Sequence, residues 1–200
     1  TVAGMATIHA ERLSIPAQVY LCLLTKLAPL DDWSATAQAR LRAWDGAMER
    51  DAVAPTIYSA FRQQLHRAIF EPLVGTALFQ EMCSATGRGA PGHLRQLASQ
   101  LVTMAATHET AWLPAGTDWL SLAAQALRQG VAELRQRLGD DMDTWGWGLL
   151  HHTRPHHPLS AIFPELAALL DPPGVALGGD GDTPQAASYS PAAPFLMSGM

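Results

Sequence analysis

The sequence is poor in lysine and cysteine and lacks any long apolar run. Lys26 is the single lysine among 13 basic residues, and the arginines are scattered along the chain. Because 18 acidic residues outnumber these bases and the net charge is -5, no basic face for nucleic acid is expected. The two cysteines have no C-x-x-C spacing, which excludes a disulfide framework and the common thiol redox motif. No stretch approaches the ~18 uninterrupted apolar residues of a membrane span, so we expect neither a nucleic-acid nor a membrane partner.

The sequence does contain enough apolar side chain for a packed core. Its 200 residues are 48% hydrophobic and 16% charged, which is typical of a folded domain rather than a disordered chain. Cys22 lies within the apolar run 19–24 and is expected to be buried. The chain opens on Thr1 without an initiator methionine, so we expect it to be a processed product or an excised part of a longer protein.

Hydrophobic periodicity predicts a mainly α chain with about six helices. Apolar residues recur at three- and four-residue spacing, and proline, glycine and capping residues mark the boundaries. Pro16 separates the first two predicted helices, Ser34 is the candidate N-cap of the third, and Asp118 and Gly139 bracket the last. A Gly-rich stretch at 85–92 is predicted to be a flexible connector. The predicted helices cover residues 2–13, 17–28, 35–45, 55–69, 94–108 and 118–138.

The composition changes after residue 142. Residues 1–142 are predicted to form the helical portion. Residues 143–200 are predicted to form an irregular, extended tail rich in glycine, proline and histidine, with one short helix at 165–170. Extended segments need neighbouring strands, so we expect the tail to pair with strands of a sheet that this chain does not contain. The near-heptad spacing of residues 120–138 fits an amphipathic core helix, which we favour, or a coiled-coil self-association face.

Half of the eight histidines lie between His151 and His157. Adjacent histidines point in different directions on either regular backbone, and Pro155 and Pro158 exclude a helix there. A catalytic zinc site usually has spaced ligands together with a carboxylate or thiolate, so we expect no dedicated metal site, and a metal-dependent enzyme remains a remote alternative. We expect one of these histidines to bond a buried carbonyl and the others to face solvent.

Two further motifs admit a functional interpretation. Residues 178–183 (Gly-Gly-Asp-Gly-Asp-Thr) resemble one imperfect copy of a calcium-binding repeat that works only in tandem, so a tight turn between two strands is expected instead. Thr1 could act as an N-terminal nucleophile whose own amine is the base. Because Thr1 precedes a helical pattern, an N-cap role is the expected one.

Four blocks in a fixed order, spread over nearly the whole chain, resemble the penicillin amidase family. The first spans 5–17, and the second is Trp-Asp-Gly followed by the segment 51–62, which ends on Phe61-Arg62. The third is Trp-Gly-Trp-Gly followed by a His-Pro pair, and the fourth is Gly-Asp-Gly-Asp-Thr followed by Tyr189. We expect the signature residues to be structural or pocket-lining: they are Trp44, Asp45, Gly46, Trp145, Gly146, His151, His157, Pro158, Gly179, Asp180, Gly181, Asp182 and Thr183.

The resemblance implies an αββα N-terminal-nucleophile fold for the parent protein, an amide hydrolase that cleaves its own precursor into two chains. In that family the serine that opens the second chain attacks an amide carbonyl, its α-amine relays the proton, and an asparagine side chain with a backbone N–H holds the oxyanion. That serine, that asparagine and the calcium ligands lie upstream of the part that this chain resembles. No catalytic residue, metal ligand or cofactor is therefore assigned to this chain.

The same resemblance sets the expectations for partners and location. The chain is expected to be an interior segment of the nucleophile-bearing β chain, with the remainder of the α and β chains as its partners. The expected substrates are acylated amines such as penicillin-type β-lactams or N-acyl homoserine lactones, and the expected location is periplasmic or secreted. The alternative is a stand-alone helical scaffold or interaction module without enzymatic activity.

Overall fold

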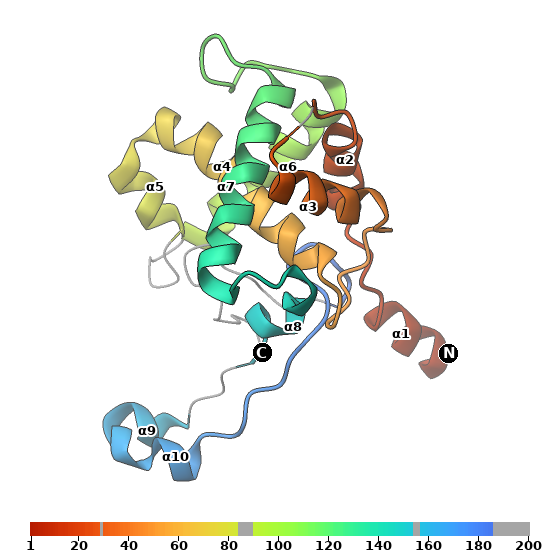
Figure 1. The fold of residues 1–200 in the computed structure, drawn as a ribbon. Coiled ribbons are helices and arrows are strands. Elements are labelled where there is room, and N and C mark those ends of the chain that lie inside the picture. The colour runs from red at the N-terminus through yellow and green to blue at the C-terminus, as the bar shows by residue number, and fades with distance from the viewer. Residues whose placement is uncertain (29, 84–89, 154–156, 186–200) are drawn as a thin grey trace.

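The computed structural model describes residues 1–28, 30–83, 90–153 and 157–185. Within these residues the chain is mainly helical, which confirms the predicted class (Figure 1). The elements are α1 (Val2–His9), α2 (Ile15–Leu24), α3 (Asp32–Arg42), α4 (Ala54–Val74), α5 (Thr76–Cys83), α6 (Ala90–Thr107), α7 (Trp119–Leu138), η1 (Met142–Thr144), α8 (Trp147–Leu150), α9 (Pro158–Ile162), η2 (Pro164–Leu166) and α10 (Ala167–Leu170).

The two longest helices, α4 and α7, pack against each other at the centre of the core. Gly130 of α7 allows this close approach, because a Cβ there would lie 2.9 Å from the backbone carbon of Ala60 in α4. Leu127, Val131 and Leu134 of α7 are buried in the core. Most of the heptad-like stripe is thus a core face, as expected of an amphipathic core helix, and its buried residues are not available for self-association. Leu120, at the start of the stripe, is 41% exposed.

Several predicted helix ends are confirmed by their capping bonds. Asp118 caps α7 in a reciprocal capping box with Ser121, and Gly139, at φ 90°, terminates the helix. Pro55 lies in the first turn of α4, where its missing N–H costs no helical bond. The hydroxyl of Thr1 accepts a hydrogen bond from the Gly4 N–H at 3.1 Å, which is the predicted N-cap role.

Several predicted helix boundaries in the first third of the chain are wrong. The second helix covers Ile15–Leu24 rather than 17–28, and the third ends at Arg42 rather than at residue 45. The first helix ends at His9 and does not reach Leu13, because Leu13 instead forms an antiparallel bridge with Ala47. The third helix is capped by Asp31 and not by Ser34, since the Asp31 carboxylate accepts the Ser34 N–H at 3.0 Å. Serine and aspartate are both favourable N-cap residues. Here Asp31, three residues before Ser34, is the cap.

The predicted burial of Cys22 and the predicted extent of the connector at 85–92 are both wrong. Cys22 is exposed rather than buried, because the buried residues of α2, such as Tyr20, Leu23 and Leu24, lie on the other side of the helix. Residues 84–89 of the predicted connector lie outside the described residues. Residues 90–92 belong to α6, so the predicted connector is too long at its end.

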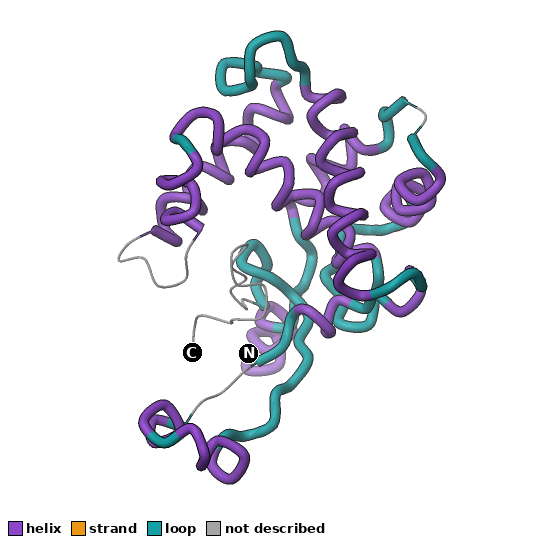
Figure 2. The backbone as a smooth tube through the Cα atoms, turned by 60° about the vertical axis from the view of Figure 1, so that its left-hand side comes forward, coloured by secondary structure: helices purple, strands orange, loops and turns teal. Residues whose placement is uncertain are grey.

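The tail contains more helix than predicted. The predicted helix at 165–170 is present as η2 and α10, but α8 and α9 were not predicted. Figure 2 shows residues 176–185 running back along the helical body, while the α9–α10 segment (residues 158–170) stands away from it. The described residues contain only isolated bridges, such as His152 with Ala176, and no strand, so the turn at 178–183 does not join two strands. Tyr189 and the rest of 186–200 lie outside the described residues.

Candidate functional site

The Trp44-Asp45-Gly46 block forms a turn after α3. The Trp44 indole N–H donates to the Ala47 carbonyl at 2.8 Å, and the Asp45 carboxylate accepts the Ala47 N–H at 2.8 Å. Gly46 has φ 91°, a backbone region that favours glycine. Its carbonyl accepts the Ser14 N–H at 3.0 Å. Each residue of the block therefore shapes the turn or ties it to the segment before α2.

The Trp145–His151 block is buried against the core. Trp145 is fully buried and stacks on Trp33 with 6.1 Å between ring centroids. Gly146 is the N-cap of α8. Trp147 is also fully buried, and its ring stacks on His151 at 4.8 Å with an interplanar angle of 14°. The His151 ring nitrogen Nδ1 lies 3.1 Å from the carbonyl oxygen of Leu177, a half-buried residue. One histidine of the cluster thus faces a carbonyl, as expected, while His152 is half-buried rather than solvent-facing.

The fourth block, Gly179–Thr183, folds into a tight turn that we name the 179–183 turn. The Asp180 N–H donates to the Thr183 hydroxyl at 2.9 Å, and the Asp182 N–H donates to the Asp180 carboxylate at 2.8 Å. Gly179 has φ 73°, and its N–H donates to the Met48 carbonyl at 2.7 Å. Gly181 lies between the two aspartates at the tip of the turn. The turn is thus braced internally and attached to residue 48.

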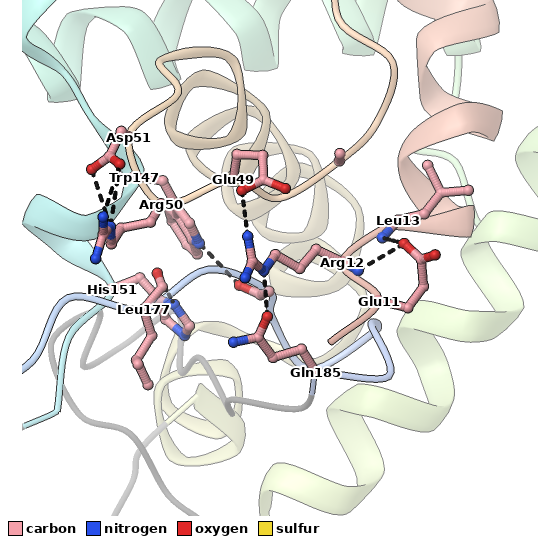
Figure 3. Close-up of polar contacts among 12 residues, drawn as sticks. Glu11, Arg12, Leu13, Glu49, Arg50, Asp51, Trp147, His151, Leu177 and Gln185 are labelled. Carbon is pink, nitrogen blue, oxygen red and sulfur yellow. Dashed lines mark hydrogen bonds and ion pairs between the residues drawn. The ribbon is translucent and has the colours of Figure 1, made fainter. Parts of the chain in front are cut away.

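These blocks, far apart in the sequence, meet at one place. The Trp147 indole N–H donates to the Gly179 carbonyl at 2.9 Å, and the Gln185 N–H donates to the Glu11 carbonyl at 2.8 Å. Figure 3 shows the Arg12 side chain between Glu49 and Gln185, joining the segments around residues 12, 49 and 185. The structure therefore brings together the segment before α2, the turn after α3, α8 and the 179–183 turn.

One arginine of α4 supplies the charge that faces the 179–183 turn. The Arg62 guanidinium pairs with Asp182 and lies 3.5 Å from the Asp180 carboxylate. It also lies 5.4 Å from the centre of the Tyr58 ring, a cation–π arrangement. The Arg62 side chain is 14% exposed and that of Asp180 is 1% exposed, so this is a largely buried ion pair.

Burial shifts the proton affinities around Arg62. It raises the pKa of Asp180 from the ordinary value of a carboxyl, although the Arg62 charge pulls that pKa down. It raises the pKa of the Tyr58 hydroxyl to about 12. Burial, assisted by the positive charge of Arg62, lowers the pKa of His66 to about 3. His66 is therefore neutral at physiological pH, and Arg62 with its two aspartates holds the charge of this cluster.

His157 and Pro158 lie outside this meeting point. Pro158 begins α9 and His157 caps it, with the ring nitrogen accepting the Leu159 N–H at 3.2 Å. Ser160 and Asp171 lie beside His157, which places the residue types of a catalytic triad together. The serine hydroxyl is bonded to the Asp171 carboxylate and to the His157 carbonyl, whereas a triad requires a serine–imidazole bond. This cluster is capping and turn chemistry.

Two surface hollows are lined by other residues. One, of about 440 Å³, lies between α3 and α7 and is lined by Trp33, Arg128 and Arg135 among others. The other, of about 590 Å³, is lined by residues of α4, α5 and α7, including Arg67 and Gln125. No signature residue lines either hollow. The signature residues that meet are thus mainly packed inside, in a constellation that braces the fold.

The described part of the chain contains neither a metal-ligating cluster nor a membrane-spanning helix. Among residues 1–28, 30–83, 90–153 and 157–185, no group of three or more histidine, cysteine or acidic side chains is placed to hold a metal ion. His156 lies outside these residues, while His151 is buried and His157 is exposed. Over the same residues, no helix combines the length and the apolar character needed to cross a membrane.

Sequence reasoning did not select Arg62 as a site residue. The residue closes the second block, but an arginine in a helix is usually solvated, so the residue type alone does not predict its burial. The sequence signal that could have identified Arg62 is its position on the apolar face of the helix. Arg62 follows Tyr58 by four residues on α4 and so lies on its inner side, where a buried charge needs a partner of opposite sign.

Comparisons with known proteins identify the family that these blocks resemble. The penicillin amidase family model matches residues 1–199. The chain is 32% identical over 198 residues to the "Penicillin acylase 2 proenzyme" of Pseudomonas sp. (strain SE83), covering 96% of this chain and 24% of that proenzyme. The chain thus spans about a quarter of the length of the curated relative that it matches. On the strength of the family match over nearly every residue, this chain belongs to the penicillin amidase family.

Proposed function

We propose that this chain is a scaffold segment of an amide hydrolase with an N-terminal nucleophile and that it does not catalyse alone. The family match over residues 1–199 carries the proposal, and the 24% coverage of the relative supports a part rather than a whole enzyme. The bonding of the signature residues supports the scaffold role. Their polar atoms bond backbone groups and each other, as Trp147 does with the Gly179 carbonyl.

The reaction follows from the family resemblance. A serine at the start of the second chain attacks the amide carbonyl of an acylated amine, and its α-amine accepts the hydroxyl proton. The C–N bond breaks, the amine leaves with a proton, and the acyl group stays on the serine as an ester. Water then attacks the ester, releases the carboxylic acid and returns the proton to the serine. We place the serine, the oxyanion-holding asparagine and the calcium ligands outside this chain.

The substrate class and location follow the same resemblance. We propose acylated amines of the penicillin or N-acyl homoserine lactone type as substrates of the parent protein, and a periplasmic or secreted location for it. The tail is proposed to continue into the sheet of the αββα parent, with the rest of the α and β chains as partners. The α4–α7 body then supports the 179–183 turn from which this continuation starts.

Turnover assays on two proteins test the proposal. The full-length parent is expected to hydrolyse a chromogenic phenylacetyl or fatty-acyl amide, and the 200-residue chain is expected to leave both intact. Thr1→Ala is the decisive variant of the chain, and Thr7→Ala on the same helix is its matched control. Absence of hydrolysis by the parent contradicts the amidase assignment. Turnover by the chain that Thr1→Ala abolishes and Thr7→Ala preserves contradicts the placement of the nucleophile elsewhere.

A further inference from the structure

The first helix, α1, presents apolar side chains with nothing against them. None of its residues is buried, and Val2, Met5 and Ile8 are 89%, 54% and 57% exposed. Their spacing of three residues places them along one side of the helix. Thr7 lies on the opposite side and bonds the Ala3 carbonyl of its own helix at 3.1 Å. The apolar side of α1 is thus an uncovered stripe.

The α9–α10 segment has the same character. Ile162, Phe163 and Leu169 are 67%, 47% and 80% exposed. Its short helices contact each other through η2, and the His157–Asp171 bond closes its base. Figure 1 shows this segment and α1 both standing out from the helical body formed by α2 to α7.

Such segments need a covering surface to be stable. An isolated helix shorter than ~12–15 residues is marginal in water, and α1 has 8 residues while α9 has 5. Clustered exposed apolar side chains mark interaction surfaces more often than scattered ones do. Tertiary packing therefore has to come from outside the described part of the chain.

We infer that α1 and the α9–α10 segment are the docking faces through which this chain seats on the remainder of the parent protein. The inference rests on the proposed function, which makes this chain part of a longer amidase. The matched relative has 76% of its length beyond the aligned 24%, which is a large body available to cover both faces. The occupant is an apolar protein surface, because the uncovered side chains are aliphatic or aromatic and carry no charge.

The test places one charge on each face in the full-length parent. Ile8→Glu and Ile162→Glu are expected to lower its thermal unfolding midpoint by several degrees, because each buries a carboxylate against an apolar surface. Thr7→Glu, on the opposite side of α1, is expected to leave the midpoint unchanged. Unchanged midpoints for both isoleucine variants overturn the inference, as does an equal loss with Thr7→Glu.

Hydrogen exchange on the unmodified parent supplies a readout that needs no variant. The amides of α1 and of 158–170 are expected to exchange slowly, and fast exchange in both segments overturns the inference. A second copy of the chain is the rival occupant. A second copy is indicated if the hydrogen-exchange protection of these segments rises with protein concentration while light scattering detects a dimer. That result overturns the inference. If neither the wild-type parent nor any variant hydrolyses an amide, the proposed function alone is contradicted. The unfolding midpoint and the hydrogen exchange do not depend on turnover and still test the docking faces.

Discussion

Replacing Arg62 by methionine tests whether charge holds the 179–183 turn to α4. The variant keeps an unbranched apolar stem and removes the guanidinium that pairs with Asp180 and Asp182. Asp182 is 29% exposed and can be solvated, whereas Asp180 is 1% exposed and cannot. Removing one partner of a buried ion pair costs ~3–5 kcal/mol. We expect a loss near the lower end, about 3 kcal/mol in the free energy of unfolding at neutral pH, because Asp180 can also take up a proton.

The pH dependence of this loss has a definite sign. Burial raises the pKa of Asp180 in the folded chain above its value in the unfolded chain. The folded chain therefore binds this proton more readily, and its stability falls as the pH rises through the folded pKa. Arg62 opposes the shift, and without it the pKa of Asp180 rises further. The difference between wild type and Arg62→Met is therefore expected to be largest above the folded pKa of Asp180 and to shrink as the pH is lowered towards the usual range of a carboxyl, about 4.

Urea unfolding of the 200-residue chain at neutral and mildly acidic pH measures both effects. The matched control is Arg62→Met combined with Asp180→Asn, which removes the buried charge and keeps an oxygen to accept the Asp182 N–H. This double variant is expected to recover about 1–3 kcal/mol relative to the additive sum of the two single changes. A loss that is the same at both pH values, together with strictly additive single changes, refutes the claim that Asp180 is a buried charge held by Arg62.

Three further substitutions test the packing and capping described above. Gly130→Ala is expected to lower the free energy of unfolding by about 1–3 kcal/mol, because its Cβ meets the α4 backbone at 2.9 Å; the neighbouring Gln129→Ala is the control, and an equally stable Gly130→Ala contradicts the close contact. Gly179→Ala is expected to loosen the 179–183 turn, since its φ is 73° and its Cβ would lie 2.2 Å from the Gln185 carbonyl oxygen; faster hydrogen exchange at Asp180 and Asp182 reports this, and unchanged exchange argues against it. Asp118→Ala is expected to lower stability by removing the α7 cap, with the loss fading in acid because the Ser121 N–H lowers the pKa of that carboxyl; a loss that persists unchanged in acid denies the carboxylate its role.

Features set by neighbours in sequence could be predicted, and features set by distant segments could not. The ends of α7 follow from Asp118 and Gly139, whose capping bonds reach only three or four residues. The apolar spacing of the first helix continues in the sequence as far as Leu13. The helix itself ends at His9, because Leu13 pairs with Ala47, 34 residues away. A periodic pattern contains no information about such a partner.

The tail illustrates the same limit for composition. Proline and glycine between 143 and 185 predict irregular backbone, but Pro158 opens α9 and Pro164 opens η2, where the missing N–H is tolerated. Arg62 and Asp180 are 118 residues apart, and neither residue type predicts burial. The ion pair between them could be found only once α4 and the 179–183 turn were placed side by side.

The signature blocks show why a motif can be found while its role stays hidden. Trp147 donates its indole N–H to the Gly179 carbonyl, Trp44 donates to the Ala47 carbonyl, and the His151 Nδ1, facing the Leu177 carbonyl, must carry a proton because a carbonyl only accepts. A bond from a side chain to a backbone carbonyl restricts the residue type on the donor side alone, since every residue has a carbonyl. The donors therefore stand out in the sequence as tryptophan and histidine, whereas acceptors such as Leu177 look ordinary. Residue identity marks one half of each contact, and the fold supplies the other half.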